Sequence, residues 1–272
     1  MARNWNDLPN ELKFMIVDKM DIVTRTKLKM CSKSDKCIVE SVPLHLDQLS
    51  IDCNSPRKVM SIDELIIHCE QDGTFHKTIK FVNNLLLPGN VHMNCFKTNQ
   101  DFPNKLSNTT IDTKMASFNG KGEEIMKWIN VLSPKTENIE IDGEDDGMLE
   151  GIGLIPVIIN AKKLNITRKN DITDEQLMTF KFTEGRIEKS KITSKGAEKL
   201  IVNIKKNSDY PLDTKIDIDV IHQPSFPSEW FGVDELKENV WHAQPCLMNS
   251  GKEVVYYYNT RLSRVFIEIR KV

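Results

Sequence analysis

The acidic run at residues 142–147 comes closest, by residue type, to metal chemistry. It reads Asp-Gly-Glu-Asp-Asp-Gly, and carboxylate oxygens are ligands that calcium prefers. A calcium loop of the EF-hand type needs acids at alternating positions and a glutamate at the twelfth, which this run does not supply. We therefore expect a solvated loop between a strand and a helix, its acids favouring the amino terminus of that helix, with no bound metal or cofactor.

The other residue types that perform chemistry form no recognisable site. The six cysteines and six histidines are scattered, without a Cys-x-x-Cys pair or a His-Glu-x-x-His motif. The phosphate loop GxxxxGK[ST], the dinucleotide motif GxGxxG and the nucleophile elbow GxSxG are all missing. The sequence therefore predicts reduced cysteines that act as small buried apolar side chains, and a protein that is not an enzyme. An enzyme concealed in the later, mixed part of the chain is the alternative.

The charge balance excludes several classes of partner. The 272 residues include 37 basic and 39 acidic side chains, a net charge of -2, which argues against a nucleic-acid binder or a membrane-surface protein. No apolar run approaches the ~20 residues of a membrane helix, and the amino terminus lacks the apolar core of a signal peptide. We expect an intracellular protein, cytoplasmic and/or nuclear.

Residues 5–43 are expected to form three short helices. The first begins near Leu8-Pro9, because proline suits an early helical position whose N–H has no partner. Asp21 is expected to cap the second helix, and Ser32 or Ser34 the third. The apolar residues at helical spacing in the first helix are Leu12, Met15, Ile16 and Met20.

The segments that follow residue 46 are shorter and alternate between polar and apolar residues. Residues 49–53 and 77–82 predict two half-buried strands, with a turn over 54–62 between the first strand and the next segment. Residues 88–113 show no clear periodicity and are expected to be rich in loops.

Strands and helices alternate after residue 113. The strands are expected at 138–142, 163–167, 186–190 and 215–220, and the helices at 122–132, 148–161, 173–177 and 194–205. The strand-to-strand offsets fall near the ~20–29-residue period of leucine-rich repeats. The consensus LxxLxLxxN is absent, so we predict an irregular β/α, leucine-rich-repeat-like solenoid. A doubly wound domain fits less well, because its strands usually form continuous apolar runs.

The carboxyl end is predicted to differ from the solenoid. Pro224, Pro227 and Trp230 indicate a loop, and residues 253–258 and 264–269 predict a terminal hairpin that caps the sheet edge. The predicted fold class is α+β.

Alternation divides each predicted solenoid strand between two faces. The residues expected to face the helices are Ile139, Ile141, Leu164, Ile166, Ile187, Ile216 and Ile218. The opposite face is polar and of mixed sign, as in a transient partner surface; a merely solvated face is the alternative. The residues expected there to bind a target protein are Glu140, Asn165, Glu188 and Asp217. Reversing its three acids to lysine is expected to abolish target binding with little loss of stability.

The amino-terminal segment resembles an F-box. The resemblance rests on Trp5-x-x-Leu8-Pro9-x-Glu11-Leu12-x-x-x-Ile16-x-x-x-Met20, followed by residues 28–34 and 38–41. Three positions depart from the family pattern. Met20 stands in place of the usual leucine, Cys31 in place of valine, and Asp35 where many F-boxes carry an aromatic residue or leucine.

The later part of the chain resembles the F-box-associated FTH (DUF38) domain of nematode F-box proteins. The similar segments are residues 128–134, 138–141 and 160–166. Ile159 or Asn160 stands where that domain commonly has a tryptophan.

These resemblances imply a substrate-recognition subunit of an SCF-type cullin-RING E3 ubiquitin ligase. An F-box at residues 1–45 would bind a Skp-type adaptor, and an FTH-like domain at 46–272 would bind an unknown target protein. The residues expected to bind the adaptor are Leu8, Pro9, Leu12, Ile16, Leu28 and Ser32. Two alternatives stay open: the apolar stripe packs on the solenoid, or the chain is an interaction scaffold with no link to ubiquitination.

Overall fold

The computed structural model describes residues 4–53, 58–63, 65–69, 74–86, 91–143, 147–206, 210–221, 241–248, 252–259 and 262–271. The chain divides into two compact units. The first comprises Met1–Lys97 and Pro103–Thr113, and the second comprises Thr98–Phe102 and Lys114–Val272. The predicted domain boundary at residues 45–46 stays a prediction.

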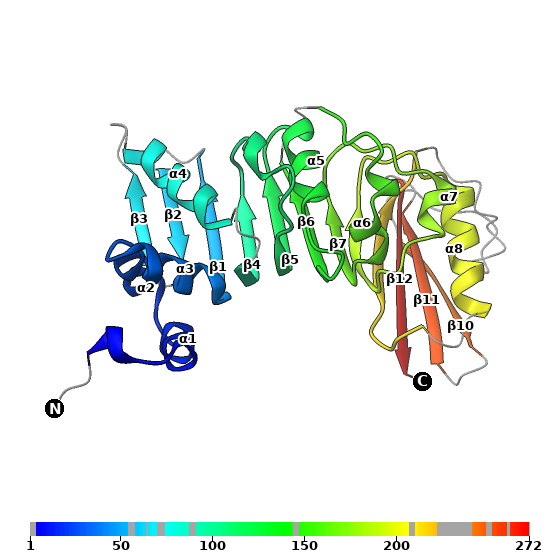
Figure 1. Ribbon diagram of the computed structural model, residues 1–272. Coiled ribbons are helices and arrows are strands. Elements are labelled where there is room, and N and C mark those ends of the chain that lie inside the picture. Colours follow the sequence, from blue (N-terminus) through cyan, green and yellow to red (C-terminus); the bar gives the residue numbers. More distant parts are fainter. Residues whose placement is uncertain are drawn as a thin grey trace. The chain divides into compact units, whose positions relative to one another are not determined.

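The first unit begins with the three expected helices. After a 3-10 turn, η1 (Trp5–Asp7), they are α1 (Asn10–Asp18), α2 (Ile22–Lys29) and α3 (Lys33–Ser41) (Figure 1). The Asp21 side chain accepts a hydrogen bond from the Thr24 amide and caps α2. Ser32, the first of the two serines considered, accepts from the Asp35 amide and caps α3. Capping residues are locally encoded, so these predictions are confirmed.

The described part of the first unit continues with four strands, one α-helix and the 3-10 turn η2 (Asn104–Leu106). The strands are β1 (Leu44–Asp52), β2 (Lys58–Ile62), β3 (Leu65–Cys69) and β4 (Val91–Thr98), and the helix is α4 (Thr74–Leu86). Their order is β4-β1-β2-β3, with β2 antiparallel to both of its neighbours.

The structure corrects three predictions in this region. Residues 77–82 lie in helix α4 rather than in a strand. Val82 and Leu86 are buried one helical turn apart, and the segment 77–82 is too short to show this spacing. Residues 58–62, predicted as part of a turn, form β2. The expected loop at 88–113 contains β4, whose buried residues shift phase between Met93 and Phe96, so that strict alternation is lost.

The second unit is a mixed, open sheet with helices. Its strands are β5 (Asp112–Asn119), β6 (Asn138–Asp142), β7 (Lys163–Ile166), β8 (Glu184–Ile187), β9 (Lys215–Asp219), β10 (Trp241–Leu247), β11 (Lys252–Asn259) and β12 (Arg264–Lys271). β5 to β9 are parallel neighbours in chain order, and β12, β11 and β10 continue the sheet with antiparallel pairing.

The side-by-side parallel arrangement of the four predicted strands is confirmed, but the second and the fourth end one residue earlier than predicted, and the third is shifted to Glu184–Ile187. The third strand ends at Ile187 rather than continuing to residue 190, where Lys189 has a left-handed φ of 49°. The hairpin of β11 and β12 is also confirmed. It does not form the sheet edge, because β10 pairs beyond it. Of the predicted loop with two prolines, residues 222–240 lie outside the described part.

The helices of the second unit are α5 (Gly122–Asn130), α6 (Pro156–Asn160), α7 (Asp174–Leu177) and α8 (Ser194–Lys206), with the 3-10 turn η3 (Ile152–Leu154). The single helix predicted over 148–161 is divided between η3 and α6. Gly151 has a left-handed φ of 73°, and Pro156 cannot continue a preceding helix, so it opens α6 instead. The α+β class is confirmed, whereas the solenoid stays a prediction.

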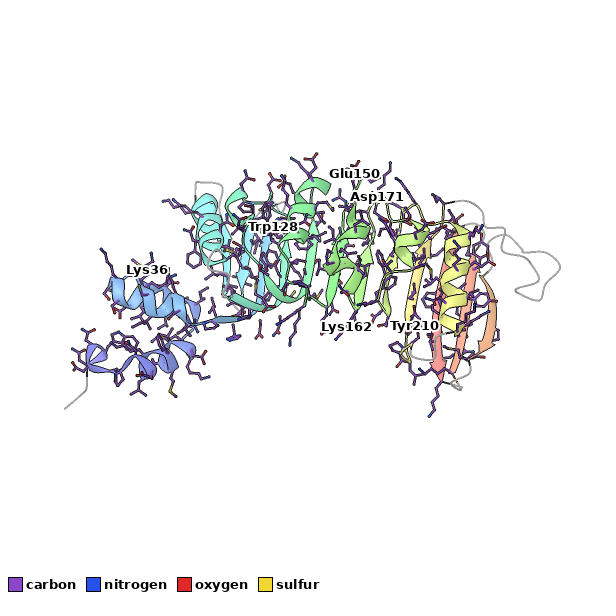
Figure 2. The ribbon with its side chains drawn as sticks, turned by 45° about the vertical axis from the view of Figure 1, so that its right-hand side comes forward. Lys36, Trp128, Glu150, Lys162, Asp171 and Tyr210 are labelled. Carbon is purple, nitrogen blue, oxygen red and sulfur yellow. The ribbon has the colours of Figure 1, made fainter. Side chains whose placement is uncertain are left out.

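The core of the second unit follows the predicted alternation. All seven residues expected to face the helices are at most 1% exposed. Trp128 of α5, labelled in Figure 2, is also buried, and its indole N–H donates to the Gln100 carbonyl at 3.0 Å. The opposite face of the strands is left for polar side chains. None of the described helices has the length and apolar character needed to cross a membrane.

Candidate functional site

Helix α1 turns most of its large apolar side chains outward. Leu12, Phe14, Met15 and Ile16 are 43%, 40%, 66% and 41% exposed, whereas the buried positions of α1 are Lys13 and Val17. Leu12, Met15 and Ile16 share one side of the helix, and Phe14 lies about 100° further round. A small monomeric domain rarely exposes several large apolar side chains on one helix unless a partner covers them. We call these four side chains the apolar face of α1.

The six predicted adaptor-binding residues occupy different environments. Pro9, Leu12 and Ile16 are exposed, and Pro9 directly precedes α1. Leu8 is half-buried. Leu28 is half-buried as well and packs on an inner cluster, formed by Val17, Ile38, Val39 and Val42 with Trp5 and Met20. Ser32 is exposed, and its hydroxyl is occupied by the cap of α3.

Asp35 has a structural role that the family pattern does not suggest. The Trp5 indole N–H donates to one carboxylate oxygen at 2.7 Å, and the Ser32 hydroxyl donates to the other at 2.7 Å. These hydrogen bonds, the one from Trp5 first, hold the pKa of Asp35 below its usual value. Asp35 thus joins the chain segment before α1 to the start of α3 by hydrogen bonds.

Sequence reasoning missed Arg25, which holds the helices from inside. Its side chain is 4% exposed, and its guanidinium donates to the carbonyls of Met20, Val42, Pro43 and Asp18 at 3.0–3.4 Å. These acceptors come from the end of α1, the turn before α2 and the end of α3. A single arginine on a helix gives no sequence signal of this role, because its acceptors are backbone carbonyls.

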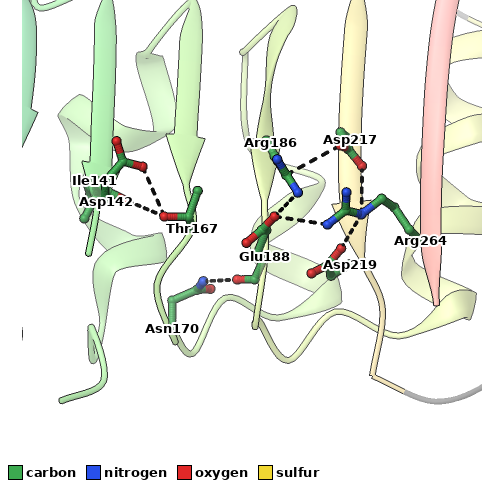
Figure 3. A network of polar contacts seen from close by, with 9 residues as sticks. All are labelled: Ile141, Asp142, Thr167, Asn170, Arg186, Glu188, Asp217, Asp219 and Arg264. Atoms are coloured by element: carbon green, nitrogen blue, oxygen red, sulfur yellow. Dashed lines mark hydrogen bonds and ion pairs between the residues drawn. The ribbon is translucent and has the colours of Figure 1, made fainter. Parts of the chain in front are cut away.

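The second candidate surface is the polar face of the sheet in the second unit. Five side chains of β8, β9, β12 and the residue after β8 form one ion-pair network (Figure 3), which comprises Arg186, Glu188, Asp217, Asp219 and Arg264. Arg264 lies at its centre and donates to Glu188 at 3.0 Å and to Asp219 at 2.8 Å. Burial raises the pKa of Asp217, and the two arginines act in the opposite direction.

The four predicted target-binding residues therefore fall into two groups. Glu188 and Asp217 belong to the network, with side chains only 15% and 23% exposed. Glu140 and Asn165 lie beside each other on β6 and β7, outside it. Reversing Glu188 or Asp217 to lysine would disrupt the network, so the expectation that the triple reversal leaves stability nearly unchanged needs revision.

A groove with a volume of about 520 Å³ lies over this polar face. Its walls come from β5, β6, β7, β8, β9 and β12 and include Glu140 and Asn165. The structure thus brings two of the four predicted residues into one concave site.

No metal site is found within the described residues. They contain no cluster of three or more histidine, cysteine or acidic side chains able to hold a metal ion. Of the acidic run, residues 144–146 lie outside the described part, so the expected loop there stays a prediction. Cys31 and Cys37 are free thiols but exposed, so the prediction that the cysteines are buried is wrong for these two.

Comparison with known proteins identifies one domain. The F-box domain family matches residues 5–47, which covers the three helices and the start of β1. Neither the curated proteins nor the solved structures include a match to this chain.

Proposed function

We propose that this F-box-containing chain is a substrate-recognition subunit of an SCF-type cullin-RING E3 ubiquitin ligase. Its F-box would bind a Skp-type adaptor, and its second unit would bind the protein to be ubiquitinated. The match at residues 5–47 supports the first part, because F-box domains bind such adaptors. In this proposal the chain binds two proteins, carries no cofactor and performs no catalysis.

The apolar face of α1 is the observation that carries the proposal. The inner cluster of the three helices is already formed by other side chains, so these residues add nothing to it. Burying apolar surface contributes about 25 cal/mol per Å², and this contribution becomes available when a partner covers the face. Pro9 lies at the amino end of the same helix, where a bound adaptor could also contact it.

Truncating this face tests the proposal. We expect Leu12→Ala with Ile16→Ala to weaken binding of the full chain to a purified Skp-type adaptor by more than about 25-fold, since truncated interface residues commonly cost about 2 kcal/mol. The matched control is Leu154→Ala with Leu212→Ala, which truncates two exposed leucines of the second unit. Isothermal titration calorimetry measures both affinities. Equal affinity in the two double variants, or no binding by the native chain, would refute adaptor recognition.

The finer assignments belong to the same proposal. We assign the region after the F-box to an FTH (DUF38)-like domain of the nematode type, with a leucine-rich-repeat-like β/α arrangement. The parallel neighbours β6, β7, β8 and β9 support this arrangement, because each is joined to the next by a segment that contains a helix. A cullin-RING ligase acts on intracellular proteins, so the proposal places the chain in the cytoplasm and/or the nucleus.

A further inference from the structure

The strand register arranges the polar face of the second unit in rows. Glu140, Asn165, Arg186 and Asp217 are direct neighbours across β6, β7, β8 and β9, and Phe266 of β12 continues the row. The adjacent row contains Asn138, Lys163, Glu184, Lys215 and Glu268. Residues of both rows line the groove of about 520 Å³. A ligand in this groove therefore meets charged side chains at fixed spacing.

The cations of these rows already have anionic partners. Lys163 is 2.5 Å from Glu184, and Lys215 is 3.8 Å from Glu268. Arg186 pairs with Glu188 and Asp217 in the network of Figure 3. Because these positive charges are compensated within the sheet, the groove offers little attraction to an anionic ligand.

Two acceptors on β6 and β7 have no such partners. Among the described residues, Glu140 forms no ion pair, and the Asn165 side chain makes no hydrogen bond, its Oδ1 atom being buried and unsatisfied. A buried polar atom without a partner costs free energy, and a rotation of the Asn165 amide that turns Oδ1 toward a donor bound in the groove would recover it. Glu140 and Asn165 therefore mark one point of the groove as a site for a hydrogen-bond donor.

The distribution of charge favours a cationic donor. This face carries seven carboxylates and four cations, counted over β6 to β9, the residue after β8, and Arg264 and Glu268 of β12. The carboxylates are Glu140, Asp142, Glu184, Glu188, Asp217, Asp219 and Glu268. Of the three surplus negative charges, two belong to Glu140 and Asp142 of β6, which have no ion pair within the described residues. The third belongs to the network, where three carboxylates meet two arginines.

We infer that the groove binds an extended segment of the target protein through a lysine or arginine side chain placed against Glu140 and Asn165. The inference deepens the target-binding part of the proposed function and depends on it. Met115 of β5 also lines the groove and offers apolar contact to the methylene stem of such a side chain. The mixed charges of the other rows would then fix the register of the segment rather than supply most of its affinity.

The test uses the full chain and a set of short fluorescein-labelled peptides. The peptides share one Ser/Gly/Ala sequence and differ at one central position, which is Arg, Lys, Gln or Glu. By fluorescence anisotropy, we expect the Arg and Lys peptides to bind about tenfold more tightly than the Gln peptide, as a charge-assisted hydrogen bond would give. Glu140→Gln should abolish this preference, and Glu140→Lys should transfer it to the Glu peptide.

Glu150→Gln is the matched control, because Glu150 is an exposed glutamate outside the groove (Figure 2). This variant should keep the native preference. No preference for the cationic peptides in the native chain, or the same preference in Glu140→Gln, would overturn the inference. Adaptor affinity, measured on the same preparations, tests the proposed function separately, since Glu140 lies in the second unit and the F-box in the first.

Discussion

The apolar face of α1 and the polar face of the second unit are built in opposite ways. On α1, apolar side chains are exposed while a buried arginine and a buried carboxylate hold the helices from inside. In the second unit, isoleucines and leucines form the interior and ion pairs cover the outside. Covering the first surface would gain free energy for any partner of complementary shape, whereas a partner of the second surface would be selected by charge.

This difference explains why one surface is recognised from sequence and the other is not. The F-box domain family matches residues 5–47, where apolar residues stand at helical spacing within one continuous stretch of sequence. The charged side chains of the sheet face come from strands that are far apart in the sequence, so no single stretch of sequence contains them.

Removing Arg25 should cause the largest loss of unfolding free energy among the variants of the two regions. Arg25→Met keeps the apolar stem and removes the hydrogen bonds to carbonyls of three segments. We expect the first unit to lose about 3 kcal/mol of unfolding free energy, because the buried carbonyl of Val42 and the partly buried carbonyl of Pro43 lose their donor. Urea denaturation followed by circular dichroism measures this loss, and adaptor binding should fall with it.

Arg25→Lys serves as the control for charge. Lysine keeps the positive charge but cannot reach several carbonyls in the planar geometry of a guanidinium. It should recover only part of the lost stability. Full recovery by lysine would mean that charge, rather than the fork of hydrogen bonds, holds the helices together.

Reversing the acids of the network should have the next largest effect. In Glu188→Lys with Asp217→Lys, Arg186 loses both of its partners and Arg264 loses two of three. We expect a loss of about 2 kcal/mol in the unfolding free energy, less than the full cost of breaking a buried ion pair because the side chains are partly exposed. Thermal and urea denaturation measure it.

Glu140→Lys is the matched reversal outside the network. It should change the unfolding free energy by less than about 0.5 kcal/mol, since Glu140 has no ion pair among the described residues. A large loss of unfolding free energy in this variant would show that Glu140 stabilises the sheet and is not available to bind a ligand. An equally small loss in the double reversal would show that the network contributes little.

Features that depend on contacts between residues close in the sequence could be predicted from the sequence. Asp21 and Ser32 cap helices through residues three positions away, so a local pattern was sufficient to predict them. The inward isoleucines followed from strict alternation within single strands. The prediction of a strand at residues 77–82 is wrong, because the helical spacing of α4 becomes visible only over its full length, Thr74–Leu86.

The polar face could not be derived in the same way. Glu188 and Arg264 are 76 residues apart in the sequence, and only the antiparallel return of β12 beside β9 brings them together. Sequence alternation placed Glu140, Asn165, Glu188 and Asp217 on one face, which the register confirms for the three strand residues. It gave no sign that two of them are engaged in ion pairs and two are not.

The smallest expected effect is on the pH dependence of stability. It comes from Asp35 and Asp217, whose pKa values are shifted in opposite directions in the two regions. The pKa of Asp35 lies below its ordinary value of 3.8, because Trp5 and Ser32 donate hydrogen bonds to the ionised form. Its contribution to stability is therefore complete above pH 3.8 and is lost as the pH falls through the lower folded-state value. The pKa of Asp217 lies above 3.8, because burial disfavours its ionised form. Ionised Asp217 therefore lowers the stability of the folded state. Stability is gained as the pH falls through the raised folded-state pKa toward 3.8 and Asp217 becomes protonated.

The variants Asp35→Asn and Asp217→Asn isolate these two contributions. Unfolding free energies of the native chain and of each variant, measured by urea denaturation from neutral to acidic pH, give the pH dependence that each carboxyl supplies. Relative to Asp35→Asn, the native chain should lose stability only below pH 3.8. Relative to Asp217→Asn, it should gain stability as the pH falls toward 3.8 from the neutral side. If both differences have the same sign, Arg186 and Arg264 outweigh burial at Asp217, and the two regions hold their carboxylates in the same way after all.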